Sequence, residues 1–174
     1  VKGLTSVTLQ STGPLVSGEQ AKAALFEIAG SVSLGASFLD PSTAFSFAAW
    51  VNCPVPQWSQ EQVIFGCALD TTKRFTVSVK SGVLAAAYNN GTTSYAASGI
   101  LTTGWHHIAT SKASGNNAPV LYVDGVAQVG TTAPTFASTN NTRFGARNDA
   151  TLFFNGHLAD CMTIPSYALT ATDA

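Results

Sequence analysis

Apolar side chains recur at every second position along much of this sequence, and this period constrains the fold more than any other feature. The segment 45–53 reads FSFAAWVNC, in which every odd-numbered side chain is apolar, and the segment 75–79 repeats the pattern. Successive side chains of a strand point to opposite faces, so this spacing predicts strands that are buried on one face. No segment sustains the apolar spacing of about 3.6 residues that marks a helix, and only 17–24 and 167–173 could hold a helical turn.

Turn dipeptides separate the alternating runs. Asn90-Gly91 and Asp124-Gly125 are hairpin signals, because Asn, Asp and Gly tolerate the positive φ angles of a two-residue turn. About a dozen short strands, with a turn signal roughly every 8–12 residues, predict an all-β sandwich or barrel.

Size and charge exclude several classes of partner. The chain of 174 residues suits one domain, and its 8 basic and 9 acidic side chains leave a net charge of −1. Without a basic stripe or a run of about 18 apolar residues, we expect no nucleic-acid partner and no membrane insertion. A surface rich in hydroxyls and amides suits an extracellular, cell-surface or virion protein, and it suits an ordinary soluble β domain equally well.

Residues 1–22 differ from the remainder of the chain. A short alternating run at 4–9 is followed by the turn-rich STGPLVSG, which predicts an edge strand or an arm that reaches a neighbour, with the domain proper at 23–174. The sequence begins at Val1 without an initiating Met, so we expect either processing or a longer parent chain.

The three cysteines, Cys53, Cys67 and Cys161, each lie in an apolar, strand-like run. We expect buried free thiols, which behave as small hydrophobic side chains. An odd count allows at most one internal disulfide, and the spacing does not select a pair.

Three blocks occur in a characteristic order: FSFAAWV at 45–51, GWHHIATSKASGNNAPVLYVDG at 104–125, and FFNGHLADCMTIPSYALT at 153–170. They resemble the concanavalin A-like jelly roll in its laminin G-like and pentraxin-like branch. The resemblance implies an antiparallel two-sheet β-sandwich. That fold serves lectins, adhesion modules, glycan-processing enzymes and virion components, so it does not by itself fix a function.

Acidic residues are spaced too widely for the catalytic device of glycan-cleaving relatives. Retaining glycosidases hold two carboxyl groups about 5 Å apart, and the resemblance implies an E-x-D-x-E type of motif. Here no two acidic residues lie within six positions of each other. We expect no enzymatic activity.

The adjacent histidines His106 and His107 invite a catalytic or metal-binding interpretation. Neighbours on a strand point to opposite faces, so they cannot hold one ion together. We expect buried imidazoles hydrogen-bonded to backbone, and we expect Asp124 to be only the hairpin residue that the Asp124-Gly125 turn requires.

Asp160 is the most suggestive metal ligand. Strand alternation places it on the face of Leu158 and Met162, and a carboxylate facing a core must be paired, hydrogen-bonded or metal-bound. The resemblance implies a structural calcium site in which Glu27 or the carbonyls near Gly30 assist Asp160. A carboxylate capped by backbone N–H groups is the alternative.

Sugar sites combine an aromatic platform with amide and carboxylate hydrogen bonds. The candidate ligand-binding residues, each of which could instead be core or loop filler, are Trp58, Tyr88, Tyr95, Tyr122, Asn148 and Asp149. These features favour a non-catalytic recognition module that binds glycan or a protein surface through loops and a sheet face. The alternative is a structural domain of a virion or surface layer, such as a capsid decoration or fibre, that forms a homo-oligomer or larger assembly through its N-terminal arm and sheet edges.

Overall fold

The computed structural model describes residues 2–10, 15–16, 19–20, 23–36, 38–40, 42–68, 73–90, 94–115, 117–130, 141–147 and 150–170. Within them the strands are β1 (Lys2–Gln10), β2 (Leu15–Val16), β3 (Glu19–Gln20), β4 (Ala23–Ala36), β5 (Phe45–Asn52), β6 (Gln62–Ala68), β7 (Lys73–Lys80), β8 (Val83–Asn90), β9 (Ser94–Ile100), β10 (Trp105–Lys112), β11 (Val120–Val123), β12 (Val126–Val129), β13 (Asn141–Phe144) and β14 (Gly156–Pro165). The described part of the chain contains no helix that could cross a bilayer.

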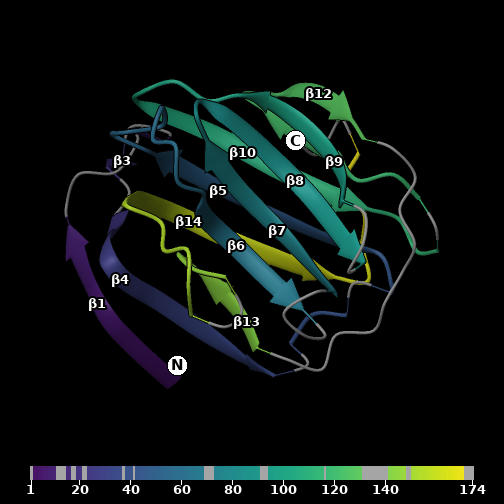
Figure 1. The fold of residues 1–174 in the computed structure, drawn as a ribbon, viewed down its shortest axis with the longest axis horizontal. Coiled ribbons are helices and arrows are strands. Elements are labelled where there is room, and N and C mark those ends of the chain that lie inside the picture. The colour runs from purple at the N-terminus through teal and green to yellow at the C-terminus, as the bar shows by residue number, and fades with distance from the viewer. Residues whose placement is uncertain are drawn as a thin grey trace.

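Two antiparallel sheets pack face to face, and β4 belongs to both. The hydrogen-bonded order is β12-β11-β10-β5-β14-β4-β13-β6-β7-β8-β9. The first half of β4 pairs with β14, through Phe26 and Gly156, and its second half pairs with β13, through Val32 and Phe144. We call the layer from β12 to β4 the β5 sheet and the layer from β4 to β9 the β7 sheet. In Figure 1, β8, β7 and β6 lie in front of β10, β5 and β14, so the predicted two-sheet sandwich is confirmed.

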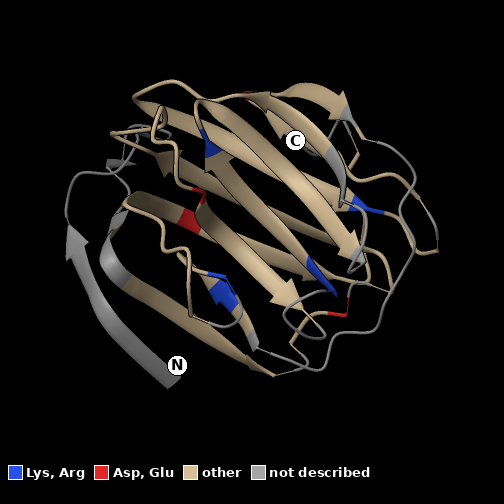
Figure 2. Ribbon diagram, viewed as in Figure 1, with Lys and Arg blue, Asp and Glu red and all other residues tan. Residues whose placement is uncertain are grey.

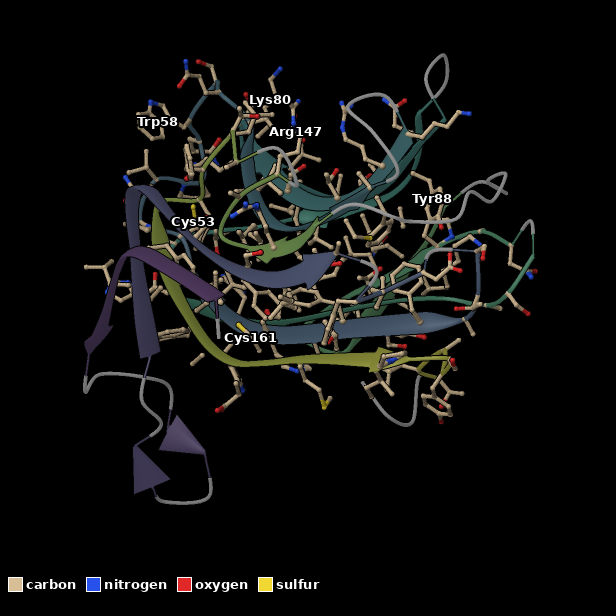
Figure 3. The ribbon with its side chains drawn as sticks, turned by 90° about the horizontal axis from the view of Figure 1, so that it is seen from below. Cys53, Trp58, Lys80, Tyr88, Arg147 and Cys161 are labelled. Carbon is tan, nitrogen blue, oxygen red and sulfur yellow. The ribbon has the colours of Figure 1, made fainter. Side chains whose placement is uncertain are left out.

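Aromatic side chains fill the space between the two sheets. The Phe47 and Phe65 rings stack with centroids 4.6 Å apart, and Phe45 meets Phe75 edge-on at 4.9 Å. All four are fully buried, and the odd-numbered side chains of 45–53 face inward as alternation predicts. Figure 3 shows the two layers edge-on with the side chains between them.

The C-terminal segment covers one half of the outer face of the β5 sheet. The Ser46 hydroxyl donates to the Tyr167 carbonyl at 2.7 Å and accepts from the Leu169 N–H at 2.8 Å. The Ser111 hydroxyl donates to the Leu169 carbonyl at 3.0 Å, and the Leu169 side chain packs on Ala48, Ala109 and Tyr122. The other half of this face lies beyond that segment, at the Trp50 and Trp105 ends of β5 and β10.

At the N-terminus, β1 pairs antiparallel with β4, from Lys2 opposite Ser33 to Gln10 opposite Ala23. Among the described residues β4 is its one strand partner, and Figure 1 shows β1 at the outer margin of the molecule. β2 and β3 form a separate two-stranded ribbon.

The cysteines are unbridged, as expected: Cys53 and Cys67 are buried, and Cys161 is partly buried. Charged side chains are sparse along the described strands, and acidic and basic ones are interspersed (Figure 2). Among the described side chains, no stripe of a single charge sign crosses either sheet.

Candidate binding site

The loop between β5 and β6 carries Trp58 and is tied to the β7–β8 turn. The Ser81 N–H donates to the Trp58 carbonyl at 2.8 Å, and the Gly82 N–H donates to the Pro56 carbonyl at 2.7 Å. Gly82 has a φ of 79°, and a Cβ at this position would lie 2.5 Å from the Gln57 side-chain amide. Glycine therefore allows both the turn and the close approach of the loop.

A second wall comes from the segment that leads into β14. The Val63 N–H donates to the Leu152 carbonyl at 2.9 Å, which docks this segment against β6. The buried amide of Gln62 joins the two walls. Its oxygen accepts from the Asn155 N–H at 3.2 Å, and its nitrogen donates to the Val55 carbonyl at 3.1 Å.

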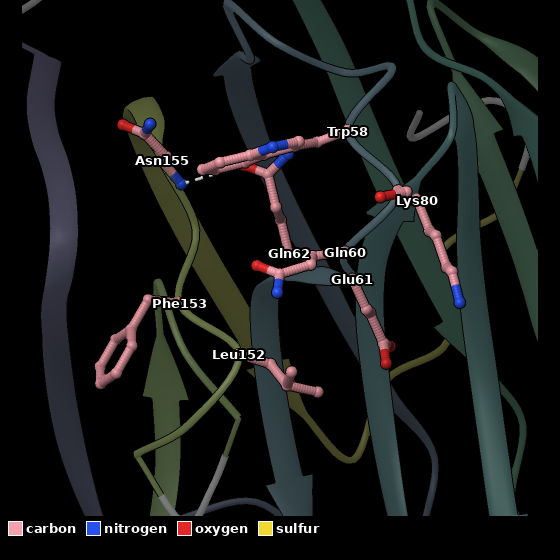
Figure 4. Close-up of a pocket in the computed structure, with 9 residues that line it drawn as sticks. Trp58, Gln60, Glu61, Gln62, Lys80, Leu152, Phe153 and Asn155 are labelled. Carbon is pink, nitrogen blue, oxygen red and sulfur yellow. Dashed lines mark hydrogen bonds between the residues drawn. The ribbon is translucent and has the colours of Figure 1, made fainter.

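Between these walls lies a groove of about 660 Å³ (Figure 4), lined by Trp58, Ser59, Gln60, Glu61, Gln62, Lys80, Leu152, Phe153 and Asn155. The Trp58 side chain is 40% exposed, which is unusual for the largest aromatic residue. A shallower hollow of about 380 Å³ shares Glu61 and Lys80 and continues over Ser78, Ala85 and Ala87 on the outer face of β7 and β8.

The surface of the groove is mainly apolar, and the two charged groups that it carries are opposite in sign. Glu61 contributes a carboxylate that accepts from the Ser78 hydroxyl at 2.8 Å, and Lys80 contributes an exposed ammonium. The amides of Gln60 and Asn155 add donors and acceptors, and Trp58 adds a flat apolar surface. This arrangement can stack on one face of a small ring while hydrogen-bonding its hydroxyl groups.

Of the residues predicted to be aromatic platforms, Trp58 lies in the groove. The prediction is wrong for Tyr88 and Tyr122, because both side chains are buried. Tyr88 is fully buried because it shares the inward face of β8 with Leu84 and packs on Phe75 at 5.5 Å. The Lys112 ammonium lies 5.2 Å from its ring and donates to the Ala113 carbonyl at 3.1 Å. Burial lowers the pKa of Lys112.

Tyr122 is 5% exposed because the C-terminal segment covers it through Leu169. The side chain of Tyr95, together with Asn148 and Asp149, lies outside the described residues.

Asp160 does not face the core, contrary to the alternation argument. The pairing of β14 with β5 shifts register between Ala159 and Met162, so a β-bulge interrupts the period of two. Asp160 sits in this bulge with a φ of 49° and is exposed, and Met162 is 47% exposed.

The described donors do not by themselves make a calcium site. No three His, Cys, Asp or Glu side chains come together within the described ranges. Gly30 is a buried position on β4, and the side chain of Glu27 is outside the described residues. A calcium site that joins Asp160 to Glu27 stays a prediction.

The two histidines point to opposite faces, as predicted, but their partners differ from those expected. His106 Nδ1 lies 2.7 Å from Asp124 Oδ2, and Nε2 lies 2.9 Å from the Thr102 hydroxyl. The other carboxylate oxygen of Asp124 accepts from the His107 N–H at 2.9 Å. The expected bonding of the imidazole to backbone is therefore wrong for His106, and Asp124 does more than its turn requires.

On the opposite face, the His107 ring lies 5.4 Å from that of Trp50. Burial lowers the pKa of His107, partly offset by the nearby Asp124 carboxylate. Neither histidine lines the groove.

Sequence reasoning missed most of the groove, including Glu61, Lys80, Phe153 and Asn155. These residues come from three separate segments that only tertiary packing brings together. The available signal was local: Trp58 stands in the polar string WSQEQ, where no alternation would bury it.

Comparison with known proteins agrees with this architecture. Residues 26–174 match the laminin G-like family model described as the concanavalin A-like lectin/glucanases superfamily. No curated protein sequence matches the chain.

Three solved structures illustrate the shared fold. Domains LG4-5 of the mouse laminin alpha1 chain are 15% identical with a TM-score of 0.68, covering 89% of this chain and 45% of that one. The botulinum neurotoxin serotype G binding domain is 14% identical with a TM-score of 0.72, covering 97% and 43%. Domain 4 of AbnA, a GH43 extracellular arabinanase from Geobacillus stearothermophilus, in complex with arabinotriose, is 18% identical with a TM-score of 0.71, covering 97% and 79%.

This chain thus spans less than half of the laminin and neurotoxin chains that it matches. The family model covers most of its length, from near the start of β4 to the C-terminus. Together with the two packed sheets, this match shows that the chain belongs to the laminin G-like family of the concanavalin A-like lectin/glucanases superfamily.

Proposed function

We propose that this domain is a non-catalytic carbohydrate-binding module whose ligand stacks on Trp58. The observation that carries the proposal is the Trp58 ring, which is 40% exposed at a groove that also presents the Glu61 carboxylate and the Asn155 amide. An indole supplies the apolar surface that the C–H face of a sugar prefers, and the polar groups match its hydroxyls.

Two observations support binding over catalysis. Glycoside hydrolysis uses a pair of carboxyl groups, whereas Glu61 is the one carboxylate among the described lining residues of the groove. The structural relatives include an arabinanase domain in complex with arabinotriose and a toxin binding domain. These relatives support a glycan or receptor ligand for this domain and an extracellular or cell-surface location.

Calorimetric titration of variants against glycans selected on an array tests this proposal. Trp58→Ala removes the platform and is expected to weaken binding at least about tenfold, equivalent to about 1.4 kcal/mol. Trp58→Phe keeps a ring and should retain part of the affinity. Val55→Ala changes an apolar side chain of the same loop that is 45% exposed and is absent from the groove lining, so it should bind like the native protein. A blank array, with or without calcium, contradicts the proposal.

A second candidate function is assembly into a larger structure. It is favoured by β1, a nine-residue strand at the margin of the molecule whose described pairing is with β4. An open strand edge is a template for pairing with another chain. Sedimentation over a wide concentration range tests this function: a concentration-dependent oligomer that is lost on deleting residues 1–22 supports it, and a strict monomer contradicts it.

A further inference from the structure

The half of the outer face of the β5 sheet that lies beyond the described C-terminal segment carries two tryptophans, two histidines and an asparagine. Trp50 and Asn52 of β5, Trp105 and His107 of β10, and His157 of β14 all lie there, and all five are partly exposed. We call these five residues the tryptophan face.

Strand register arranges the tryptophan face in two rows. In one row Trp50 lies between His107 and Ala159, and in the next row Asn52 lies between Trp105 and His157. The Trp50 and His107 rings are 5.4 Å apart, tilted by 60°, and those of Trp105 and His157 are 6.1 Å apart, tilted by 56°. Each indole is thus supported by a neighbouring imidazole and does not extend freely into solvent.

The polarity of this face is distinctive. No charged residue is among the five, and burial lowers the pKa of His107, so its imidazole is neutral near pH 7 and both donates and accepts hydrogen bonds. Exposed acidic residues lie at the two ends of the Trp50 row, with Asp124 beyond His107 and Asp160 next to Ala159. The Asp124 carboxylate is already bonded to the His106 imidazole and the His107 N–H, so Asp160 is the more available acceptor.

We infer that the tryptophan face is a second binding site, independent of the groove, for a neutral sugar ring of an oligosaccharide. Two indoles offer stacking surface, Asn52 lies between Trp105 and His157 in the strand register, and the exposed Asp160 stands at one margin. These are the components that a sugar needs and that the groove assembles separately around Trp58.

The small area that the described residues leave accessible on this face favours a small ligand over a protein. A stable protein interface takes roughly 20–30 residues a side, whereas the C-terminal segment already occupies the Ser46 and Ser111 half of this sheet. A protein partner is accordingly the alternative outcome of the experiment below.

The two sites face away from each other. Lys80, Ser78 and Ala85 of the groove region belong to the outer face of the β7 sheet, whereas the tryptophan face belongs to the outer face of the β5 sheet. In Figure 3, Trp58 and Lys80 lie on one side of the sandwich, and β14, marked by Cys161, lies on the opposite side. A module with opposed sites would cross-link glycan chains.

The three tryptophans of the chain are Trp50, Trp58 and Trp105, so every indole N–H reports on one of the two sites. We would titrate the native protein, labelled with nitrogen-15, with cellotriose, mannotriose, galactotriose and arabinotriose, and follow the three indole signals. Substitution of each tryptophan by Phe assigns the signals. A trisaccharide that binds both sites is expected to shift all three, with Trp50 and Trp105 sharing one Kd and Trp58 showing its own.

Each pattern of shifts has one meaning. A shift of the Trp58 signal alone contradicts the second site and supports binding in the groove. A shift of the Trp50 and Trp105 signals alone contradicts binding in the groove. A panel that shifts none of the three signals overturns both sites. In a separate pull-down, a partner protein that the native domain retains and Trp105→Ala loses overturns the sugar assignment.

Calorimetry gives an independent count of the sugar molecules bound per protein. Circular dichroism verifies that each variant is folded. The native protein should bind two equivalents, Trp58→Ala and Trp105→Ala one each, and the double variant none. Asn52→Ala should weaken the second site alone by roughly tenfold and serves if Trp105→Ala does not fold. One equivalent for the native protein, unchanged by Asn52→Ala, contradicts the inference.

Discussion

At the scale of single residues, the positive φ of Gly82 allows the β7–β8 turn to bond to the loop between β5 and β6. Gly82 and Gly125 have nearly the same φ, 79° and 78°, but a Cβ on Gly82 would meet Gln57 beside Trp58, and one on Gly125 would meet nothing within 4 Å. Comparing a substitution at Gly82 with the same substitution at Gly125 therefore distinguishes backbone strain from disturbance of the groove.

We expect Gly82→Ala and Gly125→Ala to lower the free energy of unfolding by a similar amount, about 1 kcal/mol each. Gly82→Ala should in addition displace the Gln57 amide, which is the end of an exposed and flexible side chain, so we expect glycan affinity to change little. Urea unfolding and calorimetry measure the two effects. Weaker glycan binding by Gly82→Ala alone would show that the groove does not tolerate this displacement.

The buried thiols predict how stability depends on alkaline pH. Burial raises the pKa of Cys161 from 9.0 to about 12, and it raises those of Cys53 and Cys67 as well. Because the folded-state values are raised, the unfolded chain loses its thiol protons first. The stabilising contribution is complete below pH 9.0 and is lost as the pH rises toward the folded-state values.

Under reducing conditions, the free energy of unfolding should decline from about pH 9 upward, by at most about 1.4 kcal/mol per pH unit for each thiol. Cys161→Ala should lessen the slope between 9.0 and about 12. Urea titrations at pH 8, 9.5 and 11 measure this. A native-like slope in Cys161→Ala would assign the decline to Cys53, Cys67 and Tyr88, whose pKa values burial also raises.

At the scale of elements, Asp124 joins the β11–β12 hairpin to β10. Its carboxylate contacts the His106 imidazole and the His107 N–H, while its backbone holds a φ of 50° in the turn. Turn formation and side-chain bonding therefore depend on one residue.

Asp124→Asn retains tolerance for the left-handed region and an acceptor for the His107 N–H, so we expect a loss below about 1 kcal/mol. Asp124→Ala removes both, and a loss of about 1–3 kcal/mol is expected. Thermal unfolding compares them. Indistinguishable variants would show that the hairpin is held by its β-ladder alone.

At the scale of the whole molecule, the C-terminal segment completes the β5 sheet. Leu169 is 9% exposed and packs on Ala48, Ala109 and Tyr122, whereas Tyr167 is 46% exposed and contributes its carbonyl to Ser46. Truncation of the Leu169 side chain should therefore lower the stability of the domain more than truncation of the Tyr167 side chain.

Leu169→Ala is expected to destabilise the domain by about 2–3 kcal/mol, near the lower end for a buried leucine. Tyr167→Ala should destabilise the domain less than Leu169→Ala, by about 1 kcal/mol or below, because nearly half of Tyr167 is exposed. Chemical denaturation tests both. A small effect of Leu169→Ala would mean that the two serine hydroxyls alone hold the segment.

The sequence alone determined the fold class, since alternation and turn dipeptides act locally. The inward face of β5, the turn at Asp124-Gly125 and the opposite orientations of His106 and His107 all follow from the period of a strand and from the φ range of Asp and Gly. The loop position of Trp58 was also predicted from the sequence, but its exposure was not, because the sequence left open whether the ring is a sugar platform or core filler.

Only the tertiary structure decided the sites. A bulge between Ala159 and Met162 moved Asp160 into solvent, and strand period alone contains no information about where a bulge falls. Tyr122 lies on an outward face, yet it is buried because Leu169, far away in sequence, covers it. The groove likewise depends on the buried Gln62 side chain, which holds the Val55 loop and the Asn155 segment together. Contacts between distant segments depend on packing, which no local pattern encodes.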